Sequence, residues 1–427
     1  MPPKNQSADT GKMGMIRWQI PLVLLVSVLI SYLDRMNISY ALPMIAKDYG
    51  WGIEETGKYG GLLMSIFFVG YGFANIFLSP LGEKFGPRKS IMFIVVLFSL
   101  FTYLQSPFGM MLTAFIVMRL FLGFSEGIHF PMMNVLTKKW FPLHERSRGN
   151  GIWVCGMFLA MILAPLIVVP IIDNFGWQNM FVVLSFSGIL VTIPLIYFFV
   201  YNKPEEHPRI TPKEVEYIAN GMELDEPDDK PFWQSLKWLS RQPTFWLAMI
   251  GGICNNIATF GMISWLPTYF TNGRGLEFSK LAYATSIPYI FSIAGVALWS
   301  YLGDKTNKRA TTAGIGFFCA SIGIYFAATA VSINAVIILF SLTILLNSAY
   351  VSNEFTIIQR IVPKQIIGSG TGIYNGFAMM IGGGIGPVLV GSIVASTGSY
   401  TSGILVLSVV LCIGGVTMLI LGRLLKY

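Results

Sequence analysis

The chain has 427 residues, of which 54% are hydrophobic and only 12% are charged, and its formal net charge is +8. Soluble globular proteins carry about 25% charged residues, so this composition excludes an ordinary soluble fold and indicates that the bilayer is part of the solvent. The positive charge lies in short clusters between apolar stretches, not along one face or in a tail, which argues against nucleic acid as a partner.

Twelve apolar stretches are long enough to cross a bilayer, which takes about 20 helical residues. The polar start of the chain runs into the first stretch without a signal-peptide cleavage site, so we read this stretch as a retained helix. We therefore expect an all-α membrane protein. The predicted helices cover residues 17–41, 55–78, 89–107, 109–136, 148–172, 177–201, 244–271, 280–301, 311–331, 334–359, 367–394 and 400–424.

The loops between these stretches differ sharply in basic charge. Of the 29 lysines and arginines, 23 lie on the side of the N-terminus, two lie inside helices, and four lie on the opposite side: Lys47, Lys58, Arg274 and Lys280. Basic loops stay in the cytoplasm. The sequence therefore predicts a multi-pass protein of the cell membrane with both termini cytoplasmic.

An internal repeat divides the chain. Leu81-Gly82-Glu83-Lys84 reappears 221 residues later as Leu302-Gly303-Asp304-Lys305, and Gly176 corresponds to Gly398 at a spacing of 222. A repeat of this length is typical of duplicated bundles. We expect two pseudo-symmetric six-helix bundles that enclose a binding site near the middle of the membrane.

The predicted bundles cover residues 1–201 and 244–427. The polar segment 202–243 between them is a cytoplasmic linker, and its simplest interpretation is a tether. Residues 213–222 within it have the pattern of a short amphipathic helix on the membrane surface.

Few ionisable residues lie within the predicted spans. A charge in lipid costs roughly 2.5–3.5 kcal/mol even on a mild scale, so such groups face protein or water and are candidates for function. The alternative is that they form buried salt bridges between helices. They are Asp34, Arg35, Arg119, Glu126, His129 and Glu354.

Arg119 and Glu126 are seven residues apart and share one helix face, with His129 near it. An arginine suits an anion because its planar fork holds a carboxylate and stays charged. A carboxylate suits a coupling proton because burial raises its pKa and a neighbouring cation lowers it. Movement between states can therefore load or release the proton. Glu354, near the end of the tenth helix, is a candidate gate or substrate group.

Other residues are candidates for lining or for control. Asn37, Tyr71 and Asn375 offer donors and acceptors to a hydroxyl-rich solute, although each alone can be a helix-packing contact. Two repeated loops have an acidic residue followed by basic ones, and we expect them to act as a conformational latch and not in binding. The latch residues are Glu83, Lys84, Arg88, Asp304, Lys305 and Arg309.

Several kinds of chemistry are absent from the pattern. We find no hydrolase, kinase or Walker motif, so neither an enzyme nor an ATP-driven pump is expected. The three histidines (His129, His144 and His207) are scattered, which argues against a metal site. We expect no cofactor.

Several motifs together resemble a known family. The chain is similar to the major facilitator superfamily, and within it to the anion:cation symporter family, which includes sugar-acid and organic-anion carriers. The motifs are Tyr32-Leu33-Asp34-Arg35-Met36-Asn37, the loop 82–89, Arg119 with Gly123, Glu126 and Pro131, Trp140-Phe141-Pro142 with Glu145-Arg146, and Trp265-Leu266-Pro267-Thr268-Tyr269.

The resemblance implies roles for individual residues. Arg35 would hold the substrate carboxylate, Asp34 and Glu126 would carry protons, Arg119 would modulate Glu126, and Tyr71 and Asn375 would line the site. The chain departs from the family pattern at Ser79, Glu83, His129, Met157 and Glu354, which argues against a simple aldonate as the substrate. Residues 244–271 contain no arginine, which argues against an organophosphate antiporter.

Together these features predict a monomeric importer of a small organic anion, such as a sugar acid, by proton symport and alternating access. A sulfonate or phosphorylated solute is the alternative substrate. A non-transporting sensor on a transporter fold is the competing class of protein. The sequence leaves H⁺ and Na⁺ both open as the coupling ion.

Overall fold

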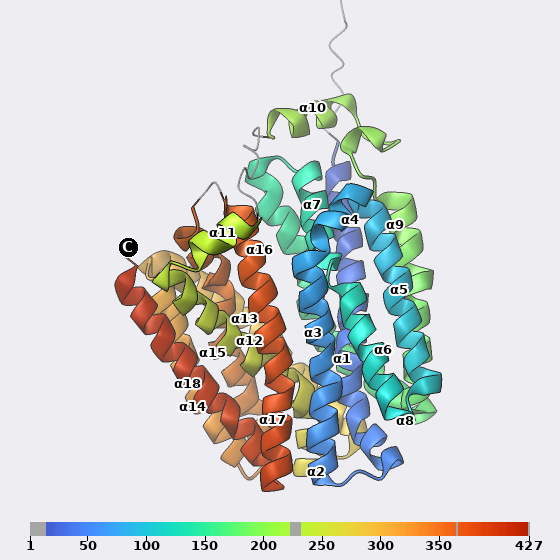
Figure 1. Cartoon of the computed structure of the whole chain (residues 1–427), viewed down its shortest axis with the longest axis vertical. Helices are drawn as coiled ribbons and strands as arrows, with labels where there is room; N and C mark the ends of the chain where they lie inside the picture. Colours follow the sequence, from blue (N-terminus) through green and yellow to red (C-terminus); the bar gives the residue numbers. More distant parts are fainter. Residues whose placement is uncertain (1–13, 223–231, 364–365, 426–427) are drawn as a thin grey trace, which may run out of the picture.

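The structure is a computed structural model that describes residues 14–222, 232–363 and 366–425. Within these residues every regular element is a helix, as predicted (Figure 1). A bilayer offers no hydrogen-bond partners to the main chain, so a spanning helix must satisfy its backbone internally. The apolar composition of the chain therefore selects helices.

The first bundle contains the helices from α1 to α9. Their bounds are α1 Gln19–Tyr49, α2 Ile53–Glu55, α3 Gly61–Phe77, α4 Ser79–Phe85, α5 Pro87–Phe108, α6 Leu112–Glu126, α7 His129–Trp140, α8 Leu143–Ser187 and α9 Ile193–Phe199. The short turns η1 (Ile16–Trp18), η2 (Thr56–Gly60) and η3 (Gly188–Thr192) complete it.

The second bundle contains the helices from α12 to α18. Their bounds are α12 Pro243–Thr268, α13 Leu281–Thr306, α14 Arg309–Thr329, α15 Ile333–Ile361, α16 Ile367–Ala378, α17 Gly384–Thr397 and α18 Tyr400–Leu424, with the turns η5 (Tyr269–Gly273), η6 (Phe278–Lys280) and η8 (Met379–Gly383). The linker carries η4 (Pro204–Glu206), α10 (Pro212–Asn220) and α11 (Phe232–Leu239).

All twelve predicted spans are present. Eleven helical stretches of the described chain are long and apolar enough to cross a membrane, and one of them, Leu143–Phe199, has 57 residues. That stretch breaks at Gly176, whose φ of 83° and ψ of 161° are not helical, so it holds two spans. The fourth predicted helix is interrupted instead: α6 ends at Glu126 and α7 begins at His129.

Left-handed backbone positions repeat between the bundles. Gly86 and Asn307 have φ of 90° and 52° and lie 221 residues apart, and Gly176 and Gly398 have φ of 83° and 64° and lie 222 apart. Glycine adopts such angles without a steric penalty, and asparagine tolerates them. Positive φ angles therefore occur at equivalent points of both halves, which supports the predicted pseudo-symmetry.

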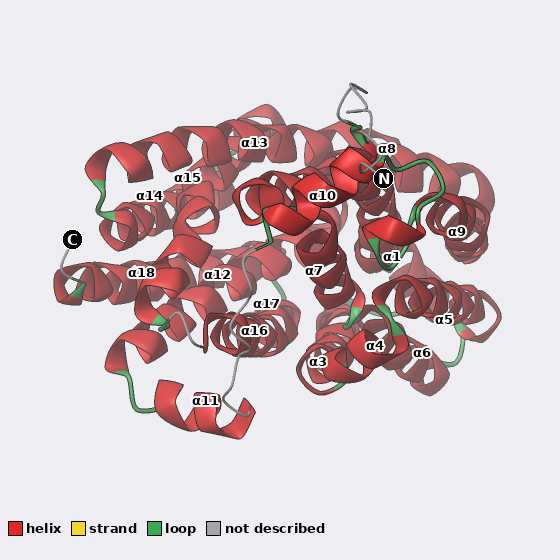
Figure 2. Cartoon of the chain, turned by 90° about the horizontal axis from the view of Figure 1, so that it is seen from above, coloured by secondary structure: helices red, strands yellow, loops and turns green. Residues whose placement is uncertain are grey.

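The bundles lie side by side and meet along two seams, α8 against α13 and α3 against α17 (Figure 2). In the first seam, the Ser286 hydroxyl donates to the Ile162 carbonyl at 2.8 Å. In the second, the Val388 amide donates to the Ser65 hydroxyl at 3.1 Å. Near the end of the second seam, a Cβ added at Gly391 would lie 2.2 Å from the Gly57 carbonyl oxygen. Glycine therefore permits the backbones to touch there.

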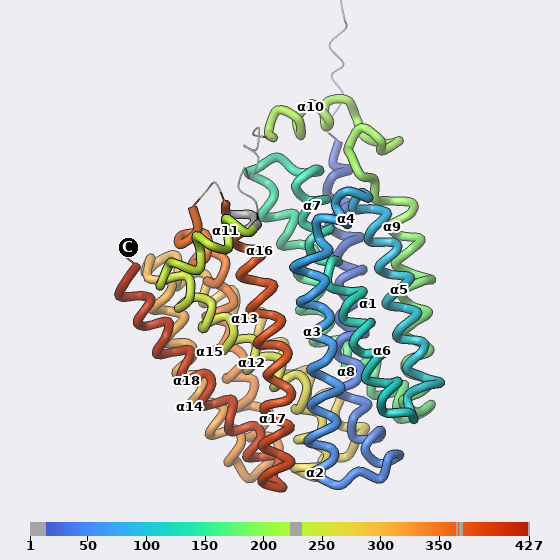
Figure 3. Tube along the Cα trace, in the orientation of Figure 1, coloured from blue at the N-terminus to red at the C-terminus, as the bar shows by residue number. Residues whose placement is uncertain are grey.

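The described parts of the linker, with η4, α10 and α11, lie at one end of the molecule (Figure 3). We call this the linker end and the opposite one the far end. The start of α1 and the end of α18 also lie at the linker end (Figure 1). The short helix predicted at 213–222 is present as α10.

Candidate functional site

The polar residues of α1 lie at the middle of the protein. Asp34 and Asn37 are fully buried and Arg35 is 5% exposed. Burying a polar or charged side chain costs free energy unless it has a partner. The contacts of each residue therefore indicate its role.

Arg35 meets Glu126 across the bundle. Its Nη2 donates to Glu126 Oε2 at 3.1 Å, and the Ser31 hydroxyl donates to the same oxygen at 3.0 Å. The guanidinium also lies 4.3 Å from the Tyr32 ring centroid and 4.7 Å from that of Tyr71, where a cation interacts with the ring electrons. The structure thus brings together three of the predicted site residues: Arg35, Glu126 and Tyr71.

Part of this guanidinium has no partner. The Nε and Nη1 atoms of Arg35 are buried, and neither has a hydrogen-bond partner in the structure. Buried arginine N–H groups are nearly always paired. Two donors of a fixed cation are therefore available to an anion.

Arg119 lies beside this pair, on α6. Its Nε donates to the Leu63 carbonyl at 3.3 Å, its Nη1 has no partner, and its guanidinium lies 5.4 Å from the Phe67 ring centroid. The shared helix face suggested that Arg119 would be the neighbour of Glu126, but the ion pair of Glu126 is with Arg35. The partner of the Glu126 carboxylate is therefore on a different helix, α1. Residue spacing along α6 alone cannot reveal such a partner.

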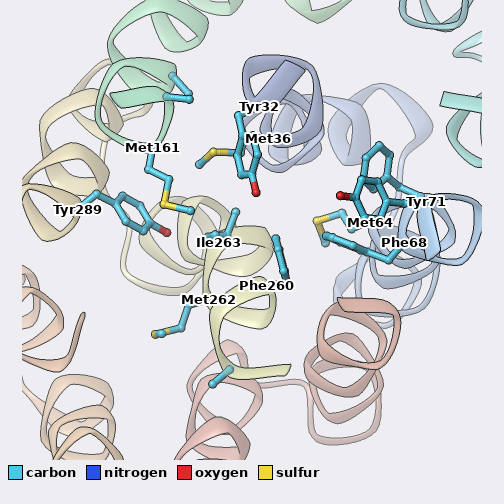
Figure 4. Close-up of a cluster of buried hydrophobic side chains, with 14 of the residues drawn as sticks. Tyr32, Met36, Met64, Phe68, Tyr71, Met161, Phe260, Met262, Ile263 and Tyr289 are labelled. Carbon is cyan, nitrogen blue, oxygen red and sulfur yellow. The ribbon is translucent and has the colours of Figure 1, made fainter. Parts of the chain in front are cut away.

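A small cavity lies between the bundles at this level. Both arginines line it, together with α1, α3 and α12, and its volume of about 10 Å³ is room for about one water molecule. Figure 4 shows the surrounding side chains, with Tyr32 and Met36 from α1 facing Phe260 and Ile263 from α12. This places the two arginines at the interface of the bundles, where the repeat predicted the binding site.

Asp34 and Asn37 do not line this cavity. Both oxygens of Asp34 and both polar atoms of the Asn37 amide are buried without a hydrogen-bond partner in the structure. Adjacent residues on a helix point in different directions, so Asp34 and Arg35 have separate surroundings, as the sequence indicated.

His129 follows the break between α6 and α7. It is 1% exposed, and its Nε2 lies 2.9 Å from the Ser27 hydroxyl. Ser27 is one turn before Ser31 on α1, so consecutive turns of α1 hold His129 and Glu126. His129 therefore lies near the Arg35–Glu126 pair without contacting it.

Glu354 of the second bundle forms a separate cluster with two tyrosines. The Tyr374 hydroxyl donates to Glu354 Oε1 at 2.7 Å and lies 2.6 Å from the Tyr350 hydroxyl. Gly252 of α12 packs against Tyr374, two turns of helix from Phe260 at the cavity. Asn375 is half-buried and is not among the cavity residues. Neither Glu354 nor Asn375 lies within the central cavity.

The two latch loops differ. In the second, Arg309 forms an ion pair with Asp304 and donates to Asn353 Oδ1 at 3.2 Å. In the first, Arg88 donates to the Tyr197 carbonyl, and its guanidinium lies 4.8 Å from the Tyr201 ring centroid.

The remaining predicted latch residues lie at the surface. Glu83, Lys84 and Lys305 are exposed, and none of the ion pairs among the described residues includes them. The two loops therefore repeat in sequence, but the acid-to-base contact forms in only one of them.

The sequence analysis missed a buried ionic cluster at the linker end. Arg17 Nε donates to Glu145 Oε2 at 2.8 Å and its Nη1 to Glu214 Oε1 at 3.1 Å, while the Tyr217 hydroxyl donates to Glu145 Oε1 at 3.1 Å. Burial and the neighbouring Glu145 raise the pKa of Tyr217. In the sequence, the Glu145-Arg146 motif is the one signal that points to this cluster.

This cluster changes the interpretation of the linker. Glu214 is fully buried and also accepts hydrogen bonds from the Ile16 and Arg17 amides at 3.2 and 3.0 Å. The helix α10 is thereby fixed to the first bundle. The position of this helix on the membrane surface stays a prediction, and the structure adds that its inner face is held by the pairing of Glu214 with the start of α1.

Comparison with known proteins agrees with this architecture. The sequence pattern of the Major Facilitator Superfamily matches residues 24–387. A bacterial homolog of the human lysosomal transporter Spinster has the same fold, with a TM-score of 0.79 at 17% identity over 96% of this chain and 97% of its own.

Three relatives of known or assigned function are similar over most of their length. The probable galactarate/D-glucarate transporter GudP of Escherichia coli is 26% identical over 95% of this chain and 93% of its own. The probable sulfoacetate transporter SauU of Cupriavidus necator is 28% identical, with 94% and 93% covered, and the hexuronate transporter of Bacillus subtilis is 25% identical, with 90% and 89% covered.

The chain therefore belongs to the Major Facilitator Superfamily, and it is a multi-pass membrane transporter, not an enzyme. Its relatives are named as transporters of sugar acids and of sulfoacetate, which agrees with the resemblance to the anion:cation symporter family noted in the sequence.

Proposed function

We propose that this protein imports a small organic anion, a hydroxylated carboxylate such as a sugar acid, in symport with protons. The observation that carries the proposal is the set of unpartnered guanidinium nitrogens on Arg35 and Arg119 at the cavity between the bundles. A fork of charged N–H donors is the group that binds carboxylates in two parallel hydrogen bonds. The names of the sugar-acid relatives support the same class of substrate.

Coupling follows from competition for Arg35. An ionised Glu126 holds one N–H of Arg35, whereas a protonated Glu126 has lost the charge that attracts it. A proton on Glu126 therefore frees the guanidinium for the substrate, and loss of the proton returns Arg35 to Glu126 and favours release. Asp34, buried without a partner, is the second carboxylate that would carry a proton.

Alternating access needs a seam that opens. The hydrogen bonds Ser286–Ile162 and Val388–Ser65 join the bundles toward the far end. We assign the linker end to the cytoplasm because it has most of the basic loop charge. In this arrangement the bundles are held together on the outer side, and the substrate would leave toward the cytoplasm. We expect a monomer to suffice, since one chain supplies both bundles.

A thermal-shift screen of the purified protein tests the substrate class. The screen would include aldonates, uronates, aldarates, sulfonates and sugar phosphates. A ligand at 100 times its Kd stabilises the folded protein by about 2.7 kcal/mol. A shift with a sugar acid that disappears in Arg35→Ala supports the proposal. If only sulfonates shift the melting temperature, the substrate class is a sulfonate and not a sugar acid. If no anion shifts it, the proposal of anion binding is contradicted.

Flux measurements in proteoliposomes test the coupling. Uptake of a shifting ligand should follow an inward proton gradient and stop when a protonophore collapses it. Uptake that follows a sodium gradient at constant pH would make Na⁺ the coupling ion and would overturn the roles of Asp34 and Glu126 as proton carriers.

A further inference from the structure

The far end of the molecule contains a second and larger cavity. Its volume is about 420 Å³, within the range of 300–1,000 Å³ that is usual for small-molecule sites. One wall is formed by the end of α1 with Trp51, and the other by η5 with Asn272 and by the residues from there to Phe278 at the start of η6. The cavity therefore lies between the bundles, on the side that we assign to the exterior.

Both walls are built rigidly. On the first, the Trp51 amide donates to the Ala46 carbonyl at 2.8 Å, and the Trp51 ring stacks on Tyr49 with centroids 4.6 Å apart. On the second, the Leu276 amide donates to the Phe270 carbonyl at 2.9 Å, and Arg274 Nε donates to the Tyr269 hydroxyl at 2.8 Å. The cavity is therefore shaped before any ligand arrives.

Its chemistry suits an organic anion. Lys47 lines the cavity, and its ammonium group forms no ion pair with a described residue. The neighbouring acids are engaged elsewhere: Asp48 accepts a hydrogen bond from Trp177 Nε1 at 2.8 Å, and a hydrogen bond from Lys280 lowers the pKa of Glu277. Asp48 keeps its negative charge but directs one oxygen to Trp177, so Lys47 offers the cavity a positive charge that no ion pair among the described residues holds, beside an indole face and the Asn272 amide.

One face of α1 connects the two cavities. Met36 lines the central cavity, Pro43 and Lys47 line the outer one, and Tyr40 lies between them. These residues are spaced 4, 3 and 4 apart, which places them on one side of a helix. At 1.5 Å per residue, Lys47 lies about 16 Å beyond Met36 along the axis. The outer and central cavities therefore lie along the same face of α1.

We propose that this cavity is an outer vestibule that captures the transported anion before it reaches the central site. Lys47 attracts the carboxylate, the Trp51 ring covers the carbon chain, and Asn272 hydrogen-bonds the hydroxyl groups. Lys47 and Trp51 both belong to the first bundle, so this half of the vestibule stays intact when the bundles separate. The inference rests on the proposed function, since its ligand is the transported anion.

Uptake kinetics in proteoliposomes test the vestibule, with D-glucarate as the probe. Removal of one unit charge close to the anion should raise KM about fivefold, because two charges about 4 Å apart in water interact by about 1 kcal/mol. Lys47→Gln should show this increase at low salt, with unchanged kcat, and the increase should shrink at high salt.

Lys58→Gln is the matched control. Lys58 is the other basic residue of the first bundle at this end, but it lies over the Tyr59 ring at 5.5 Å and outside the cavity. Its KM should equal that of the wild type. Equal KM values for Lys47→Gln and Lys58→Gln would overturn the vestibule while leaving the proposed function intact.

A second measurement does not depend on transport. Asn272→Cys places a thiol in the cavity, and its reaction with an anionic methanethiosulfonate should be faster than with a cationic one of similar size. Lys47→Gln should remove that preference, and Lys58→Gln should keep it. If D-glucarate is not transported but the preference follows Lys47, the anion vestibule stands and the assigned substrate fails. No preference in Asn272→Cys would refute the vestibule directly.

Discussion

At the scale of residues, the central feature is a guanidinium that is only partly satisfied. Arg35 gives one N–H to Glu126 and has two buried nitrogens without partners. An unpaired buried donor costs about 1–3 kcal/mol. Under the proposed function, the transported anion supplies the missing acceptors.

Arg35→Lys tests the geometry of this group at constant charge. Lysine has no planar fork, and each hydrogen bond to a charged group contributes about 1.5–3 kcal/mol, so we expect anion affinity to fall at least about tenfold. Titration calorimetry with the ligand found in the screen measures this. Wild-type affinity in Arg35→Lys would exclude recognition by two parallel hydrogen bonds.

Glu126→Gln tests the proton at the same site. The amide mimics a protonated carboxyl, so Arg35 remains free and exchange of substrate across the membrane should continue. Accumulation driven by a proton gradient should be abolished, because the side chain can no longer gain or lose a proton. Counterflow and gradient-driven uptake in the same proteoliposomes separate the two activities, and full accumulation would show that Glu126 does not carry the proton.

At the scale of elements, the linker helix α10 is a docked part of the first bundle. Arg17 and Glu214 form a buried pair with side-chain exposures of 4% and 0%. Removing one partner of a buried pair typically costs about 3–5 kcal/mol. Glu145 also pairs with Arg17, so Arg17 keeps one partner when Glu214 is removed. The loss of stability should therefore lie toward the lower end of this range.

Glu214→Ala should therefore release α10 from the bundle. We expect a lower melting temperature and faster trypsin cleavage within residues 203–213 of the linker. Glu216→Ala is the control, since Glu216 lies on the same helix but is exposed. Equal cleavage of the two variants would show that the ionic cluster does not fix the linker.

At the scale of the whole molecule, the contact between the bundles at the far end depends on glycine. The Cβ of an alanine at position 391 would lie 2.2 Å from the Gly57 carbonyl oxygen, and a backbone atom cannot move aside as a flexible side chain does. Such a contact must separate the two bundles at this end.

Gly391→Ala should shift the population of states toward one that is open at the far end. Accessibility of Met36→Cys, a buried position at the central cavity, to an impermeant thiol reagent added from outside should rise several-fold as a result. Gly372→Ala is the control, because nothing lies within 4 Å of a Cβ at that position. Unchanged accessibility in Gly391→Ala would mean that this seam does not close the outer side.

Much of this architecture could be predicted from the sequence. Apolar length alone fixed the helical class and the twelve spans, because a bilayer leaves the backbone no other way to satisfy its hydrogen bonds. The repeat predicted two related bundles, and the left-handed pairs Gly86 with Asn307 and Gly176 with Gly398 follow the same period. The cost of burying charge singled out Arg35, Glu126 and Arg119.

What remained for the tertiary structure to decide was which groups meet. Arg35 and Glu126 are 91 residues apart, and Arg17 and Glu214 are 197 apart, so no local pattern could have paired them. The structure also placed Glu354 in a tyrosine cluster outside the central cavity. The reason is physical: helix formation is satisfied within each segment, whereas contacts between segments depend on how whole helices pack.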